Sequence, residues 1–254
     1  MSTPQRIAIT GAGGFLGRGM VKVLGEHFSL RLLDVVPIEG KHESMIGDVA
    51  KLEDAMALCE GCTGLVIAHM APQGPQNYGT PTVPFDVNVK GTAHLFHAAV
   101  AHGIKRVVLI SSGGAVQRHA AEGKFMTADL PLAPQAMYTL TKALQEQIAR
   151  YYFENHGVEV SVLRPYYICD EDSLTDKYGI KRPTVNGQFI DPRDIGEAAR
   201  LSFLVPKLGF EIFYLMGHPD GEAKADIKHL RDFLGWKAKH SFEKYPRDGE
   251  VPGT

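Results

Sequence analysis

The sequence predicts an α/β fold of the doubly wound type, in which a parallel sheet carries helices on both faces. Short, almost wholly apolar segments, typical of strands buried on both faces, alternate with amphipathic segments of helical length. The first such strand runs directly into a turn with glycines at positions 11, 13, 14 and 17. With 254 residues, of which 44% are hydrophobic and 22% charged, the chain can bury a substantial core.

In the amino-terminal part of the chain, apolar runs predict four strands, at 6–10, 28–34, 44–48 and 64–69. Helices are expected at 14–26 and 51–59, between strands, and at 84–102, after the fourth strand. The first helix has an apolar face formed by Leu16, Met20, Val23 and Leu24, and the third ends at Gly103.

In the remainder of the chain we expect strands at 106–112, 158–164 and 210–216, and helices at 136–156, 193–205 and 222–233. The polar and aromatic stretch 166–188 is predicted to be irregular. It follows the end of a strand, where α/β sheets bind ligands, so we expect it to form a substrate loop. No repeat or linker divides the chain, and we expect one domain, 1–254, with a small substrate-binding cap from 166–190 and 207–254.

The 27 basic and 29 acidic residues give a net charge of −2 and are interspersed, so neither nucleic acid nor an anionic membrane is an expected partner. The first residues lack the pattern of a secretory signal, and the apolar runs are too short to span a bilayer. We therefore expect a cytoplasmic protein.

A C-x-x-C spacing at Cys59 and Cys62 raises the alternative of a redox or zinc site. A zinc site needs a second pair or histidines at ligand spacing, which Cys169 alone does not supply. We expect these two cysteines to be small buried residues between a helix and a strand, and no metal site.

The turn after the first strand has the pattern T-G-x-x-G-x-x-G. Glycines let the backbone approach a pyrophosphate, whose charge is stabilised by free N–H groups at the helix start. Because a strand precedes the turn and an amphipathic helix follows it, we expect a dinucleotide site. The turn residues expected to bind the cofactor are Gly11, Gly14, Phe15, Leu16 and Gly17.

Asp34 ends the second strand, close to the spacing of about 20 residues at which an acid hydrogen-bonds a ribose 2′-hydroxyl. This carboxylate would repel a 2′-phosphate, and no Lys or Arg follows immediately in the sequence. NAD is therefore expected in preference to NADP.

Further motifs follow in order along the chain: Gly47-Asp48-Val49, Ala68-His69-Met70-Ala71, Asn88-Val89-Lys90-Gly91-Thr92, Ser111-Ser112, Tyr138-Thr139-Leu140-Thr141-Lys142 and Leu163-Arg164-Pro165. Together with the glycine turn, they resemble the extended short-chain dehydrogenase/reductase family, the NAD-dependent epimerase/dehydratase group. The resemblance implies a Rossmann fold, an NAD-dependent oxidoreductase and further cofactor contacts from Asp34, Asp48, Val49, Ala68, His69, Met70, Asn88, Ser111, Tyr138, Lys142 and Pro165.

Tyr138 and Lys142 lie four residues apart on a predicted helix, and an ammonium beside a phenol lowers the pKa of the phenol. The phenolate would act as general base, while Ser112 hydrogen-bonds the substrate oxygen. Ser111 is expected behind Ser112, although the choice between these two hydroxyls stays open. The resemblance implies that Asn88 supports a proton relay behind Lys142, and a structural role is the equal alternative.

The chain leaves little room to hold a nucleotide-sugar, so we expect a small sugar-like alcohol. It resembles the uronate dehydrogenases, which oxidise a free sugar acid to a lactone, in its segment 233–237. It departs from them at Gly113, where they carry Asn, and at Tyr167, where they place a substrate-contacting Ser. The expected substrate contacts are His69, Gly113, Tyr167 and Arg182, with Arg118 as the alternative clamp for a carboxylate.

Two other functions stay open: a sugar or nucleotide-sugar epimerase/dehydratase, and a non-catalytic NAD(P)-sensing protein. Sensing proteins tend to lose the Tyr or the Lys, and this chain has both Tyr138 and Lys142. In the family that the chain resembles, helices corresponding to 84–102 and 136–156 build a four-helix interface. By that analogy we expect a homodimer.

Overall fold

The computed structural model describes residues 6–73 and 78–249, and these contain a seven-stranded parallel sheet of order β10-β6-β5-β4-β1-β2-β3. Its strands are β1 (Arg6–Thr10), β2 (Ser29–Asp34), β3 (Glu43–Ile46), β4 (Gly64–Ile67), β5 (Arg106–Ile110), β6 (Glu159–Pro165) and β10 (Phe210–Leu215). The predicted doubly wound sheet is confirmed. Strand order reverses between β1 and β4, where the carboxyl ends of the strands leave a crevice.

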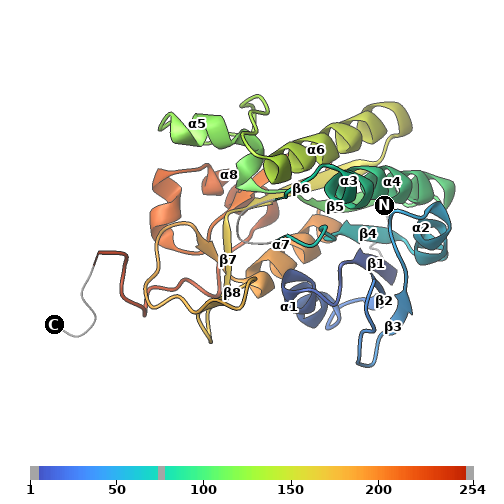
Figure 1. Ribbon diagram of the computed structural model, residues 1–254, viewed down its shortest axis with the longest axis horizontal. Helices are drawn as coiled ribbons and strands as arrows, with labels where there is room; N and C mark the ends of the chain where they lie inside the picture. Colours follow the sequence, from blue (N-terminus) through green and yellow to red (C-terminus); the bar gives the residue numbers. More distant parts are fainter. Residues whose placement is uncertain (1–5, 74–77, 250–254) are drawn as a thin grey trace.

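Helices cover both faces of this sheet (Figure 1). On one face α1 (Phe15–Leu24) packs against α7 (Pro192–Leu204), with α8 (Ile227–Leu234) beside β10. The other face carries α2 (Leu52–Cys59), α4 (Gly91–Ala101) and α6 (Met137–His156). Gly157, at a φ of 65°, ends α6 in the left-handed conformation that glycine favours.

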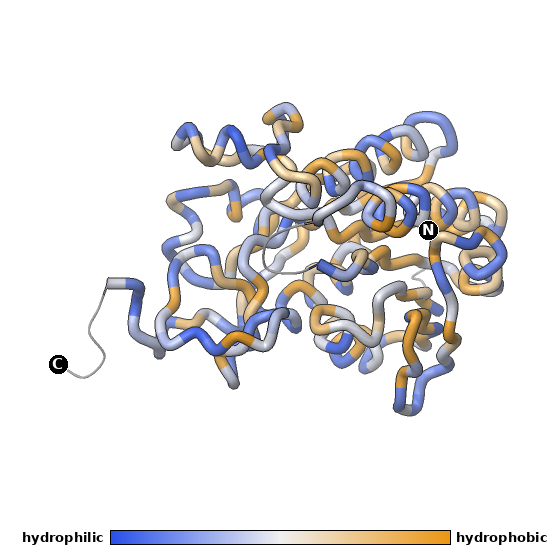
Figure 2. The backbone as a smooth tube through the Cα atoms, viewed as in Figure 1, coloured by the Kyte–Doolittle hydropathy of each residue, from blue (hydrophilic) through white to orange (hydrophobic). Residues whose placement is uncertain are grey.

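Alternating residues of each strand point to the two faces and form two cores. On β1, Ile7 and Ile9 join the core beneath α1 and α7, whereas Ala8 joins the core beneath α2, α4 and α6. Hydrophobic segments accordingly concentrate along the strands and the inner sides of the helices (Figure 2). Cys59 ends α2 and Cys62 precedes β4, both as buried free thiols, as expected.

The stretch predicted to be irregular contains two strands of a second sheet, of order β8-β7-β9, and the third strand, β9, follows it directly. Its strands are β7 (Tyr167–Asp170), β8 (Thr175–Asp176) and β9 (Phe189–Ile190). Strands of two to four residues are too short for an alternating pattern to reveal them. Side chains of this small sheet, Cys169 and Phe189 among them, pack against Phe242 near the carboxyl end of the described residues.

Two of the predicted helices are each replaced by a series of shorter elements. The helix expected at 84–102 is divided into α3 (Thr82–Pro84), the π-helical turn η1 (Phe85–Lys90) and α4. The helix expected at 222–233 is the 3₁₀ turn η3 (Pro219–Ala223) followed by α8, which begins only after Asp226 caps the His229 N–H. The 3₁₀ turn η2 (Gly113–Val116) and α5 (Gln117–Ala121) were not predicted.

Candidate active site

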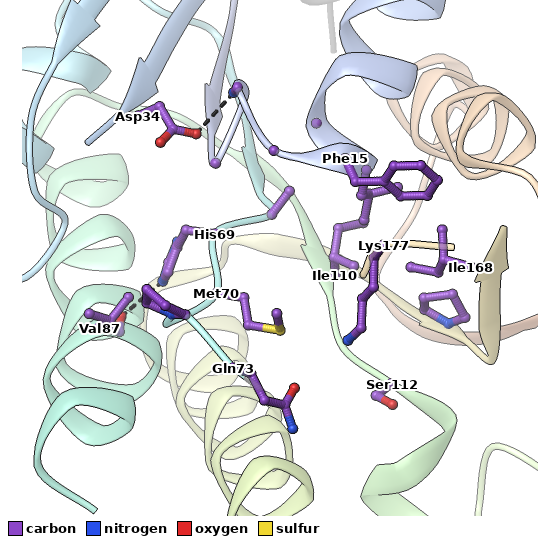
Figure 3. A pocket seen from close by; sticks show the side chains of 18 of the residues that line it. Phe15, Asp34, His69, Met70, Gln73, Val87, Ile110, Ser112, Ile168 and Lys177 are labelled. Atoms are coloured by element: carbon purple, nitrogen blue, oxygen red, sulfur yellow. Dashed lines mark hydrogen bonds between the residues drawn. The ribbon is translucent and has the colours of Figure 1, made fainter. Parts of the chain in front are cut away.

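A cavity of about 720 Å³ opens at the carboxyl ends of β1, β2, β4, β5 and β6 (Figure 3). Its wall contains every predicted cofactor contact except Asn88. Ser112 and Tyr167 also line it, whereas Gly113 and Arg182 do not. Residues that are far apart in sequence therefore meet at the crevice that the reversal of strand order creates.

The glycine turn brings backbone close to backbone at two positions that require glycine. Gly11 has a φ of +66°, and a Cβ there would lie 2.7 Å from the Cα of His69. A Cβ on Gly17 would lie 2.1 Å from the carbonyl oxygen of Gly11. Gly14 stands at the N-cap of α1 and carries no side chain that could cap it, so the first N–H groups of α1 suit an anion.

Two carboxylates lie at the same end of the cavity as this turn. Asp34 accepts hydrogen bonds from the N–H of Gly13 at 2.9 Å and of Val35 at 2.8 Å (Figure 3). Asp48 accepts from the N–H of Ala50 at 2.9 Å. Each carboxylate keeps further lone pairs, so the space beside the two carboxylates favours hydroxyl donors over a phosphate.

His69 is buried in the cavity wall with both ring nitrogens engaged. Its Nε2 lies 3.0 Å from the carbonyl oxygen of Val87, and its Nδ1 lies 3.0 Å from the hydroxyl of Thr10. Since a carbonyl only accepts, Nε2 carries the proton and Nδ1 accepts from Thr10. Burial and the charge of Lys142 lower the pKa of His69 to about 3. The neutral ring thus joins the segment after β4 to η1 and leaves neither nitrogen for the predicted substrate contact.

Ser112 and Tyr138 form the pair at the centre of the site. The Ser112 hydroxyl accepts from the N–H of Gly114 at 3.1 Å and is hydrogen-bonded to the Tyr138 phenol. Ser111 turns away and donates to Glu146, which forms a buried ion pair with Arg164. The geometry therefore favours Ser112 over Ser111 as the hydroxyl that works with Tyr138.

The Lys142 side chain is held by the backbone at the end of β5. Its ammonium donates to the carbonyl of Ile110 at 2.8 Å, at the end of β5. Burial, and then the charge of Lys177, lower the pKa of Lys142 to about 7. The pKa of Tyr138 is raised, because burial outweighs the hydrogen bond from Ser112.

Asn88 lies behind the wall, fully buried in the π-helical turn. Its side-chain oxygen accepts from the N–H of Ala71 at 2.7 Å, and its amide donates to Thr141 at 3.0 Å and to Tyr78 at 3.3 Å. These partners belong to the segment after β4 and to α6. The contacts fit the structural alternative: Asn88 fixes the start of α6 relative to the cavity, and Lys142 is not among its partners.

The predicted substrate side differs most from expectation. A Cβ on Gly113 would lie 2.5 Å from the ring of Tyr166, which fills the space that a side chain would take and separates Gly113 from the cavity. Arg182 pairs with Asp176 at 2.9 Å outside the lining, and Arg118 is exposed on α5. Neither of the two expected carboxylate clamps reaches the cavity.

Three lining residues at the end of β8 and in the turn after it were not predicted: Asp176, Lys177 and Tyr178. Asp176 is 1% exposed and accepts from the hydroxyl of Tyr167 and from the N–H groups of Tyr178 and Ile180. The sequence placed all three in the expected substrate loop, but which of them faces the cavity depends on the turn that Asp176 organises.

Within the described ranges, no group of three or more His, Cys, Asp or Glu side chains is arranged to hold a metal ion. Over those ranges, too, no helix combines the length and apolar character needed to cross a membrane.

Comparisons with known proteins identify the family and related structures. A model of the NAD dependent epimerase/dehydratase family matches residues 7–172. A uronate dehydrogenase of Agrobacterium fabrum is 28% identical over 96% of this chain and 88% of its own length. An L-arabinose 1-dehydrogenase (NAD(P)(+)) of Haloferax volcanii is 27% identical over 77% of this chain and 81% of its own. A solved structure of a mutant uronate dehydrogenase from Agrobacterium tumefaciens complexed with NAD has a TM-score of 0.76 at 25% identity, covering 94% of this chain and 86% of that one.

Proposed function

The chain belongs to the NAD-dependent epimerase/dehydratase family, and from that premise we propose that it is an NAD-dependent dehydrogenase of a small sugar or sugar acid. The observation that carries the proposal is the hydrogen-bonded pair of Ser112 and Tyr138, with Lys142 beside it in the cavity that the glycine turn opens. The relatives named above act on sugars of this size.

In the proposed reaction a carbinol group becomes a carbonyl, or a lactone where the anomeric carbon of a ring is oxidised. Ser112 holds the substrate oxygen, and Tyr138 removes its proton as the C–H bond breaks. Bound NAD supplies the acceptor for the hydride that leaves this carbon and, on its ring, a positive charge. Lys142, when protonated, favours the phenolate form of Tyr138 through its charge.

We also propose NAD as the preferred cofactor over NADP, because the Asp34 carboxylate lies beside the glycine turn and would repel a 2′-phosphate. The residues proposed to bind it are those of the lining named above. Segments 166–190 and 207–254 are proposed as the substrate-binding cap, since Phe242 and Tyr245 of the second pack in a small core with side chains of the first. A homodimer and a cytoplasmic location complete the proposal.

The test is NADH formation by the purified protein with a panel of sugars, sugar acids and polyols, run with NAD and with NADP. We expect turnover with at least one sugar, faster with NAD, and a loss of at least about 100-fold in kcat in Tyr138→Phe. An exposed tyrosine serves as control, because Tyr151→Phe changes no residue of the cavity. If no alcohol is oxidised while NAD copurifies and sugars are interconverted, the epimerase alternative replaces the dehydrogenase.

A further inference from the structure

Lys177 extends from the turn after β8 into the cavity, on the side where Ser112 lies (Figure 3). Its ammonium lies 5.1 Å from the centre of the Tyr138 ring and 5.0 Å from the centre of the Tyr178 ring. Aromatic faces attract an ammonium without using up its N–H donors. The group is therefore held in place close to the proposed general base, with donors left for a ligand.

The carboxylate next to Lys177 in sequence already has other partners, although its charge raises the pKa of Lys177 against the larger effect of burial. Asp176 pairs with Arg182 at 2.9 Å and accepts from Tyr167 and from two backbone N–H groups. Over residues 6–73 and 78–249, no ion pair of Lys177 with a carboxylate is found. Asp34 and Asp48, the other acids of the lining, lie at the glycine-turn end.

The sugar is proposed to bind beside Ser112 and Tyr138. This part of the cavity holds the amino groups of Lys142 and Lys177, and within the described lining no carboxylate there is without a partner. Burial lowers the pKa of Lys177, and the charge of Lys177 in turn lowers the pKa of Lys142. A partly buried cation beside a second cation is costly unless an anion accompanies it. A ligand that brings a negative charge would stabilise the charged form of both lysines.

We propose that Lys177 binds an anionic group, a carboxylate or a phosphate, of the sugar that the enzyme oxidises. The inference rests on the proposed function and adds the substrate class to it. The short distance from the Lys177 ammonium to the Tyr138 ring places the anion within the span of one sugar ring from the oxidised carbon. Binding of the carboxylate, expected of Arg182 or Arg118, thus falls to Lys177, which lies on the same segment as Arg182.

The experiment measures binding by calorimetry to the NADH-loaded enzyme, in which no turnover occurs. Galacturonate, glucuronate and glucose 6-phosphate are compared with galactose and glucose, using the wild type, Lys177→Met and Lys177→Arg. Lys181→Met is the matched control, because Lys181 is exposed on the same segment and outside the lining. Galacturonate and glucuronate report on a carboxylate, and glucose 6-phosphate reports on a phosphate.

We expect at least one anionic sugar to bind about 10- to 100-fold more tightly than its neutral counterpart, as a charged hydrogen bond allows. In Lys177→Met the ratio of the two affinities should fall to about 1. Lys177→Arg should keep part of the wild-type ratio, and Lys181→Met should match the wild type. A merely structural lysine would weaken acidic and neutral sugars alike. Any of three results overturns the inference. The first is an equal loss of affinity for acidic and neutral sugars in Lys177→Met. The second is equal affinity of the wild type for both kinds of sugar, and the third is no binding of any anionic sugar.

The proposed function is judged separately, by NADH formation in the wild type. Oxidation of neutral sugars together with no preference of the wild type for any anionic sugar refutes the anion site and leaves the dehydrogenase standing. An anion that binds through Lys177 without any sugar being oxidised refutes the dehydrogenase and leaves the anion site standing.

Discussion

Burial is the largest influence on the pKa of three side chains in the cavity wall. It lowers the pKa of Lys142 to about 7 and that of His69 to about 3, and it raises the pKa of Tyr138. In each case the neutral form is favoured, as desolvation requires. Under the proposed function, the positive charge of bound NAD would favour the phenolate form of Tyr138, and an anionic sugar would favour the charged form of Lys142.

The histidine makes a prediction about acid stability. The pKa of His69 is 6.5 in the unfolded chain and about 3 when folded, so the unfolded state takes up a proton first as the pH falls. Its contribution to stability is present above pH 6.5 and is lost at up to about 1.4 kcal/mol per pH unit below it. Between pH 7 and 5, the free energy of unfolding should fall by roughly 2 kcal/mol more in the wild type than in His69→Gln.

Urea unfolding at the two pH values measures this difference. His97→Gln is the control, because His97 is exposed on α4, and it should retain the wild-type pH dependence. Equal pH dependence in His69→Gln and the wild type would show that the ring takes up its proton in the folded protein.

At the scale of elements, the segment 166–190 depends on one carboxylate. Asp176 connects Tyr167 of β7 to Arg182 and to the backbone of the turn that carries Lys177. The side chain of Asp176 is buried whereas that of Arg182 is 37% exposed, so solvent screens the ion pair and the buried hydrogen bonds matter more.

We expect Asp176→Ala to lower the free energy of unfolding by about 1–3 kcal/mol, because buried N–H and hydroxyl donors lose their acceptor. The KM for the sugar should rise more than the KM for NAD, since the turn carries Lys177 and Tyr178. Steady-state kinetics and urea unfolding measure both effects. Asp172→Ala is the control, a change at an exposed acid of the same segment. Equal changes in the two KM values would contradict the role given to this turn.

The same segment shows where sequence reasoning reaches and where it stops. Gly11, Asp34 and Tyr138 could be found because each belongs to a local pattern attached to a long element. Lys177 could not, because strands of two to four residues leave no periodicity from which its direction follows. The π-helical turn around Asn88 is likewise too short to leave a periodic pattern in the sequence. The raised pKa of Tyr138 could not be predicted either, because its main cause is burial, which arises only on folding.

Across the whole molecule, the reversal of strand order between β1 and β4 gathers the cofactor residues, but it does not determine the sugar. Relatives of similar identity act on uronate and on L-arabinose, one acidic and one neutral. Both sheets contribute to the cavity, the large one with Ile110 of β5 and the small one with Tyr167 of β7. Substrate choice is therefore expected to reside in the small sheet and its turn.

The surface of the molecule bears on the proposed homodimer. Val100 on α4 is 37% exposed, and on the neighbouring α6 Leu140 and Tyr151 are 37% and 53% exposed. Large apolar side chains on adjacent helices mark a surface that a second copy can cover. A dimer built there would bury Tyr151, so a charge at this position should oppose association.

We expect light scattering after gel filtration to give twice the chain mass of 27.8 kDa for the wild type, and the chain mass for Tyr151→Glu at the same concentration. Ile46→Glu places the same charge on the edge strand β3, at a side chain 64% exposed, and should remain dimeric. A wild type of single-chain mass would refute the homodimer itself. A Tyr151→Glu protein that stays dimeric would instead place the interface away from α4 and α6, because a carboxylate buried without a partner destabilises an interface by several kcal/mol.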